Sequence, residues 1–84
     1  MSFVIYVSKN RIECEGGSGH IRSSAVLDLK ASPGVDLNRI FDLEDDNALA
    51  RAKADLRTLT DHQLLCWAGH QIFADSRATQ IVRL

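Results

Sequence analysis

Hydrophobic residues occupy alternate positions in three segments of the first half of the chain, which is the period-two pattern of β-strands. In the first segment, Phe3, Ile5 and Val7 share one face, and the two later segments repeat this alternation. Asn10 favours a tight turn after the first segment, because asparagine tolerates positive φ. The glycine-rich residues 16–19 predict a flexible loop after the second. The pattern therefore predicts three strands, over residues 3–8, 11–15 and 24–30.

The second half of the chain shows helical periodicity instead. Hydrophobic residues recurring at i, i+3, i+7 and i+10 predict a helix over residues 47–59, and they are Leu49, Ala52, Leu56 and Leu59. Asp45 or Asp46 is placed to cap the N-terminus of this helix. Arg51 and Asp55 stand four residues apart, so we expect them to form an ion pair on its surface.

A second helix is predicted from a capping box, in which Thr60 is followed three residues later by Gln63. This helix is expected over residues 61–74, with a buried stripe of Leu64, Leu65, Ala68 and Ile72. Residues 36–41 predict a short helical turn ahead of the first helix. Residues 79–84 predict a last strand that returns to the sheet.

These elements predict an α+β fold in one domain, residues 1–84. We expect a three- to four-stranded, mostly antiparallel sheet packed by two helices. The pattern leaves open whether Gly69 ends the second helix, because glycine both terminates helices and occurs inside them at a cost of about 1 kcal/mol. A chain of 84 residues leaves little room for both a core and a deep pocket.

Charge and cysteine content narrow the expected environment and partners. The net charge is −1, whereas proteins that bind nucleic acid through phosphates are usually basic, so we do not expect direct nucleic-acid binding. Two cysteines are too few for a disulfide scaffold. The first residues lack the pattern of a signal peptide, and no segment has the length of a membrane span. We therefore expect a cytoplasmic protein with no membrane association.

Two ligand-binding templates fail at named positions. A dinucleotide-binding loop that used the glycines of residues 17–19 would need a third glycine where Arg22 stands. A calcium loop starting at Asp42 would need glycine in place of Asn47 and glutamate in place of Lys53. Neither segment predicts a cofactor or a metal ion.

His62, Cys66 and His70 are spaced four residues apart and run along one flank of the second predicted helix. Neighbouring members could share a metal or form a Cys–His nucleophile pair. A structural zinc site needs four ligands, and Gln63 stands where a zinc protease would carry its glutamate base. We therefore expect no metal, no cofactor, no catalytic residue and no enzymatic activity.

The remaining candidates are surface residues that would contact a partner protein. They comprise an acidic cluster, Arg51, the arginine of a small basic strip that Lys53 and Arg57 form at i and i+4, and the single tryptophan. Trp67 falls outside the predicted buried stripe, so it either packs in the core or anchors a partner. The candidate partner-binding residues are Asp42, Glu44, Asp45, Asp46, Arg51, Arg57 and Trp67.

In its size and α+β organisation the chain resembles the anti-CRISPR inhibitors made by phages and mobile elements. No motif carries this resemblance. It implies a small, non-enzymatic protein-binding module whose partner is a host defence ribonucleoprotein of several subunits, a CRISPR effector complex. The acids 42 and 44–46 would then occupy a basic surface meant for nucleic acid.

Two alternatives stay open. One is a nucleic-acid-binding or regulatory accessory protein that uses Arg51, Lys53, Arg57, Arg77 and Arg83. The other is a subunit of a small metal- or thiol-dependent enzyme.

Overall fold

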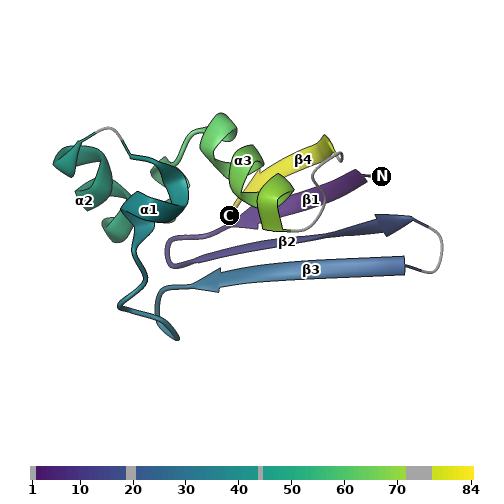
Figure 1. Ribbon diagram of the computed structural model, residues 1–84, viewed down its shortest axis with the longest axis horizontal. Helices are drawn as coiled ribbons and strands as arrows, with labels where there is room; N and C mark the ends of the chain where they lie inside the picture. The colour runs from purple at the N-terminus through teal and green to yellow at the C-terminus, as the bar shows by residue number, and fades with distance from the viewer. Residues whose placement is uncertain (1, 19–20, 44, 72–76) are drawn as a thin grey trace.

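The computed structural model describes residues 2–18, 21–43, 45–71 and 77–84, and the structural statements below concern those residues. They form a four-stranded sheet with helices gathered at one end and over one face (Figure 1). This confirms the predicted α+β class. None of the described helices is long and apolar enough to cross a membrane. In chain order the elements are β1 (Ser2–Val7), β2 (Arg11–Ser18), β3 (Ile21–Asp28), α1 (Leu37–Phe41), α2 (Asp46–Ala54), the 3₁₀ turn η1 (Leu56–Thr58), α3 (Asp61–Gln71) and β4 (Arg77–Arg83).

The sheet has the strand order β3-β2-β1-β4. The pairs β1–β2 and β2–β3 are antiparallel, and β4 runs parallel to β1, so the sheet is mixed but mostly antiparallel as predicted. The register places Ile5 of β1 opposite Cys14 of β2 and Ile81 of β4. Ile5 and Cys14 are fully buried, and this face of the sheet carries the core.

The second and third strands are longer at their junction than the sequence predicts. β2 runs to Ser18 and β3 starts at Ile21, whereas a glycine loop over 16–19 and a strand from residue 24 were expected. Gly16 pairs with Phe3 on one side and with Ser23 on the other. A glycine in a strand that pairs with neighbouring strands on both sides lies within two sets of backbone hydrogen bonds. These hydrogen bonds offset the entropic cost of ordering the glycine.

The third strand ends earlier than predicted, at Asp28 rather than residue 30. The Asp28 carboxylate accepts hydrogen bonds from the backbone N–H groups of Lys30 at 2.9 Å and Ala31 at 3.4 Å. Arg11, the first residue of β2, lies opposite Asp28, so no residue of β2 remains to pair with residues 29 and 30.

The predicted helix over residues 47–59 is wrong as a single helix, because the chain breaks at Asp55. Asp55 has extended backbone angles (φ −159°, ψ 108°), and its carboxylate accepts a hydrogen bond from the backbone N–H of Arg57 at 2.9 Å. The chain continues as η1 instead. The N–H of Leu56 donates to the carbonyl of Lys9 at 2.9 Å, which fixes the break against the β1–β2 turn. The N–H groups of Leu56 and Arg57 thus donate to the Lys9 carbonyl and to the Asp55 carboxylate. These two hydrogen bonds replace the ones that the same N–H groups would make inside a continuous helix.

The break also changes the ion pair expected between Arg51 and Asp55. The Asp55 carboxylate pairs with Arg57 instead, at 2.9 Å from Nε to Oδ1 and 2.7 Å from Nη2 to Oδ2. Hydrogen bonds from the Arg57 side chain and backbone lower the pKa of Asp55 to about 2. The same pair raises the pKa of Arg57.

The start of α3 matches the prediction. The N–H of Gln63 donates to Thr60 Oγ1 at 3.1 Å, and the N–H of Thr60 donates to Gln63 Oε1 at 2.9 Å, which completes the capping box. Gly69 lies inside α3, which ends at Gln71. The predicted last turn, residues 72–74, lies outside the described residues. Residues 37–41 form the expected short turn as α1.

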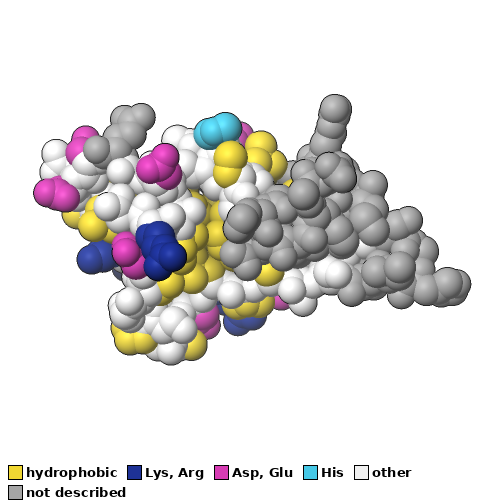
Figure 2. All heavy atoms as spheres, viewed as in Figure 1, with side chains coloured by type: hydrophobic (Ala, Val, Ile, Leu, Met, Phe, Trp, Pro, Cys, Tyr) yellow, Lys and Arg dark blue, Asp and Glu magenta, His cyan; other side chains and the backbone are white. Residues whose placement is uncertain are grey.

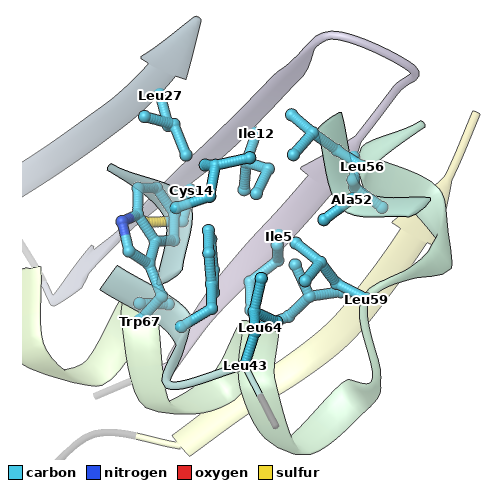
Figure 3. Close-up of a cluster of buried hydrophobic side chains, with 14 of the residues drawn as sticks. Ile5, Ile12, Cys14, Leu27, Leu43, Ala52, Leu56, Leu59, Leu64 and Trp67 are labelled. Carbon is cyan, nitrogen blue, oxygen red and sulfur yellow. The ribbon is translucent and has the colours of Figure 1, made fainter. Parts of the chain in front are cut away.

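The core face of α3 differs from the predicted stripe. Leu64, Trp67 and Ala68 are buried, whereas Leu65 is 38% exposed. Trp67 is only 5% exposed, so the interpretation of Trp67 as an exposed partner anchor is wrong. The alternative prediction, that Trp67 packs in the core, is confirmed. Figure 3 shows Leu64 and Trp67 projecting into the cluster that contains Cys14. The indole is the largest apolar group on this helix, and its burial outweighs that of a leucine.

The burial of Trp67 predicts a large loss of stability on truncation. Trp67→Ala should cost about 3–5 kcal/mol of unfolding free energy, from lost burial and the cavity left behind. Leu65→Ala, its neighbour at an exposed position, should change stability by only about 0.5 kcal/mol or less. Urea denaturation followed by circular dichroism compares the two variants, and equal effects would contradict this packing.

The Asp55–Arg57 pair predicts a specific dependence on pH. The pKa of Asp55 is about 2 in the folded protein and near 3.8 ordinarily, so the pair stabilises the fold above that value. Its contribution is lost as the pH falls from about 4 to about 2. Asp55→Asn should lower stability slightly at neutral pH, because the pair is exposed to solvent. The difference from the parent protein should shrink across that acid range. Denaturation at a series of pH values measures it, and a difference independent of pH would refute the assignment.

Candidate functional site

Two adjoining hollows lie where the α1–α2 loop meets the start of α3. The first, here called the α2 hollow, has a volume of about 210 Å³. The second, the α1–α3 hollow, has a volume of about 440 Å³. They share Thr60 and Gln63, so the capping box forms the wall between them. The α2 hollow is further lined by Leu43, Asp45, Ala48, Arg51, Thr58 and Leu59, and the α1–α3 hollow by Ile40, Phe41, Asp42, His62 and Cys66.

The acidic cluster borders both hollows, and the backbone fixes its position. Asp42 ends α1 in the left-handed conformation (φ 50°), which aspartate tolerates better than most residues. Asp45 caps α2, accepting a hydrogen bond from the N–H of Ala48 at 2.7 Å. Asp46 lies in the first turn of α2, where a negative charge complements the helix dipole. All three carboxylates are exposed. Glu44, the fourth predicted acid, lies outside the described residues.

The buried side chain of Leu43 holds this loop against the core. It stands between the α1 cap and the α2 cap, so both acidic caps start from an anchored backbone. The sequence predicts the acids and one cap. It does not predict that the loop packs over the start of α3.

Of the two arginines proposed for partner binding, only Arg51 lies with the acids. Arg51 is exposed and lines the α2 hollow together with Asp45. Arg57 lies beyond the break at Asp55, so the predicted strip of Lys53 and Arg57 along one helix does not form. The guanidinium of Arg57 binds Asp55 and donates from Nη1 to the main-chain oxygen of Leu84 at 2.8 Å.

Arg83 also makes contacts within the fold, although its side chain is exposed. Its Nη2 donates to the carbonyl of Leu59 at 3.0 Å and lies 2.6 Å from Oδ1 of Asp61. Arg57 and Arg83 therefore connect the end of β4 to η1 and to the start of α3. Nothing in the local sequence pattern signals these two contacts, which span 27 and 24 residues. The side chain of Arg77 lies outside the described residues.

His62 and Cys66 line the α1–α3 hollow, and both side chains are exposed. Their Nε2 and Sγ atoms are 3.6 Å apart. Cys14 lies in the core, where burial raises the pKa of its thiol, and neither cysteine forms a disulfide. Among the residues that the structure describes, no three or more His, Cys, Asp or Glu side chains are grouped to hold a metal ion. The side chain of His70 is not among them.

Thr58, Thr60 and Gln63 are lining residues that the sequence did not single out as surface candidates. The capping box identifies Thr60 and Gln63 only as the start of a helix. No protein-family model, curated protein or solved structure matches this chain. Its surface chemistry therefore carries the argument for function.

The capping role of Asp45 predicts different effects for two substitutions. Asp45→Ala removes the side-chain acceptor of the α2 N-cap and should cost about 1 kcal/mol of stability. Asp45→Asn keeps an acceptor of similar capping strength, so it should retain most of that stability while removing the charge. Chemical denaturation of both variants checks this. Equal losses would show that charge, rather than capping, is what Asp45 contributes.

Proposed function

We propose that this protein is a non-enzymatic protein-binding module that engages its partner with the α2 hollow and the adjoining acidic loop. The observation that carries this proposal is that Asp45 and Arg51, which have opposite charges, line the same hollow. Leu43 and Leu59 line the same hollow and are buried. A small apolar base with opposite charges around it can select a protein surface of matching charge pattern.

The distribution of charge favours a protein over a nucleic acid as the partner. Figure 2 shows acidic and basic side chains intermixed over the α1 and α2 end of the molecule. Phosphate binding needs free cationic groups, and the guanidinium groups of Arg57 and Arg83 are taken up by internal contacts. The nucleic-acid alternative relies on five cations, and these contacts occupy two of them, so it receives less support.

The more specific form of the proposal is an inhibitor that binds a host defence ribonucleoprotein, a CRISPR effector complex. The resemblance in size and architecture suggests this form. In it, the carboxylates of Asp42, Asp45 and Asp46 take the place of phosphates on a basic surface of the partner. Such an inhibitor would compete with nucleic acid for its partner.

Affinity purification from the native host, followed by mass spectrometry, identifies the partner. Binding to that purified partner is then measured with the triple variant Asp42→Asn, Asp45→Asn, Asp46→Asn. Asparagine suits both the left-handed cap and the helix N-cap, so the fold should persist. We expect association to slow by about tenfold or more, with a smaller effect at high salt.

A matched control is the double variant Glu13→Gln, Glu15→Gln, which removes acids from the opposite face of the sheet. It should leave binding unchanged. Unchanged binding by the triple variant, or an equal loss in the control, would overturn the proposed surface. A partner with no nucleic acid and no basic groove would overturn only the inhibitor form.

A further inference from the structure

The outer edge of β3 is a surface that the proposed function does not use. β3 is the end strand of the sheet, and among the described residues no further strand lies beside it. Figure 1 shows this edge along the bottom of the sheet, with no helix lying across it. The backbone groups that point outward along β3 are therefore available to another strand.

The hydrogen bonds between β2 and β3 identify these backbone groups. The N–H of Leu29, the residue after β3, donates to the carbonyl of Asn10 at 2.9 Å. Hydrogen-bonded pairs alternate along an antiparallel ladder, so the odd-numbered residues of β3 bond to β2. The N–H and C=O groups of the even-numbered residues, 22 to 28, point outward. Of these groups, the carbonyl of Asp28 accepts a hydrogen bond from the N–H of Ser32, and the others line the open edge in the described part of the chain.

β3 lacks the features that usually keep an edge strand from pairing, which are lysine, proline and bulges. Its sequence contains no lysine and no proline, and its register with β2 is unbroken over all eight residues. At the other side of the sheet, the register between β4 and β1 shifts between Phe3 and Val4. Val26 of β3 is 48% exposed on the face opposite the core. A long, regular and partly apolar edge of this kind favours the addition of a strand.

The partner that fits this edge is a second copy of β3, running antiparallel and centred on Ala25. In this register Ser24 lies opposite Val26 of the second copy, and their outward groups form reciprocal hydrogen bonds. The register also brings the positions of Arg22 and Asp28 opposite each other at both ends of the pair. These residues carry opposite charges, and opposite charges across a ladder favour pairing.

The neighbouring symmetric registers lose this charge complementarity. Centring the pair on Ser24 places Arg22 opposite Val26, so neither end has an opposite charge. Centring the pair on Val26 places Arg22 opposite Lys30, which carries a like charge and lies beyond the strand. The register centred on Ala25 is therefore the one in which the strand is complementary to itself.

The same register extends the core. Ala25 lies on the core face of β3, where it is partly buried and packs against the buried cluster. A second Ala25 placed opposite it would cover the side that is still open. A pair of edge strands buries less surface than an obligate dimer, so we expect weak association that depends on protein concentration.

We propose that two copies of this chain associate by antiparallel pairing of their β3 strands, which joins the two sheets into one continuous sheet. The contact uses neither the α2 hollow nor the acidic loop. It is therefore independent of the proposed partner binding and is measured on the purified protein alone.

Sedimentation equilibrium in a reducing buffer tests the association, over concentrations from about 10 μM to 1 mM. The mass should rise from one chain towards two. Val26→Pro removes an outward N–H, and proline is tolerated where the N–H of an edge strand faces solvent, so its dissociation constant should rise at least about tenfold. Val26→Thr keeps the N–H and the branched shape, so its dissociation constant should stay within about threefold of the parent value. A monomer throughout the range, or parent-like association of Val26→Pro, would overturn the proposal.

A charge variant keeps the test decisive if Val26→Pro does not fold, which circular dichroism shows. Arg22→Asp leaves the backbone groups in place and puts like charges opposite each other in the register centred on Ala25. Its association should weaken by about tenfold at low ionic strength, with a smaller change at high salt. Association equal to that of the parent at low ionic strength would refute this register.

Disulfide cross-linking measures the register directly. Ser24→Cys and Val26→Cys are each made with Cys66→Ser, because Cys66 is exposed whereas Cys14 is buried. Residues opposite each other in a hydrogen-bonded pair have Cα atoms about 5.5 Å apart, which suits a disulfide. Mild oxidation of an equal mixture should therefore give mainly the mixed disulfide between residues 24 and 26, identified by mass spectrometry. Predominance of either homodimer would contradict the register centred on Ala25.

Discussion

The interruption of the helical segment at Asp55 is the constraint on which the arrangement of the two layers depends. If the helix continued, the N–H of Leu56 would bind within it and not the carbonyl of Lys9. Arg57 would then project from another face, away from the main-chain oxygen of Leu84. The break therefore places one short segment in contact with the β1–β2 turn and with the end of β4. It also lets Leu56 reach full burial.

The same break determines what charge the surface presents. It commits Arg57 to internal bonds, and Arg83 completes the connection by reaching Leu59 and Asp61. Arg57 and Arg83 are consequently part of the scaffold. The anions of the α1–α2 loop sit at helix ends, where backbone geometry rather than ion pairing holds them. The arginines that connect β4 to the rest of the fold are thus separate from the acids of the proposed binding surface, of which Asp45 also caps α2.

Sequence reasoning predicted the fold class, the positions of the first and last strands and the start of α3, because these follow from periodicity and capping, which are local. It missed features in which local signals compete with tertiary contacts. The periodicity of Leu56 and Leu59 fits a continuous helix, but Asp55 can cap a turn equally well, and only the docking to Lys9 decides between them. Glycine by itself predicts a loop, but Gly16 lies in a strand because β1 and β3 pair with it on both sides.

The candidate site was predictable only in part, for a related reason. The acids and Arg51 are visible in the sequence, yet the hollow that unites Asp45 with Arg51 depends on how η1 and α3 approach α2. Trp67 was assigned to the core only as an alternative, because helical periodicity cannot rank a tryptophan above a leucine when both border the buried face.

The parallel pairing of β4 with β1 has a further, kinetic consequence. It requires closure of a loop of roughly 70 residues, from Val7 to Arg77, whereas the other two strand pairs form across short turns. The β1–β2–β3 meander can therefore assemble early, and the outer edge of β1 remains unpaired until the helices have brought β4 back to it.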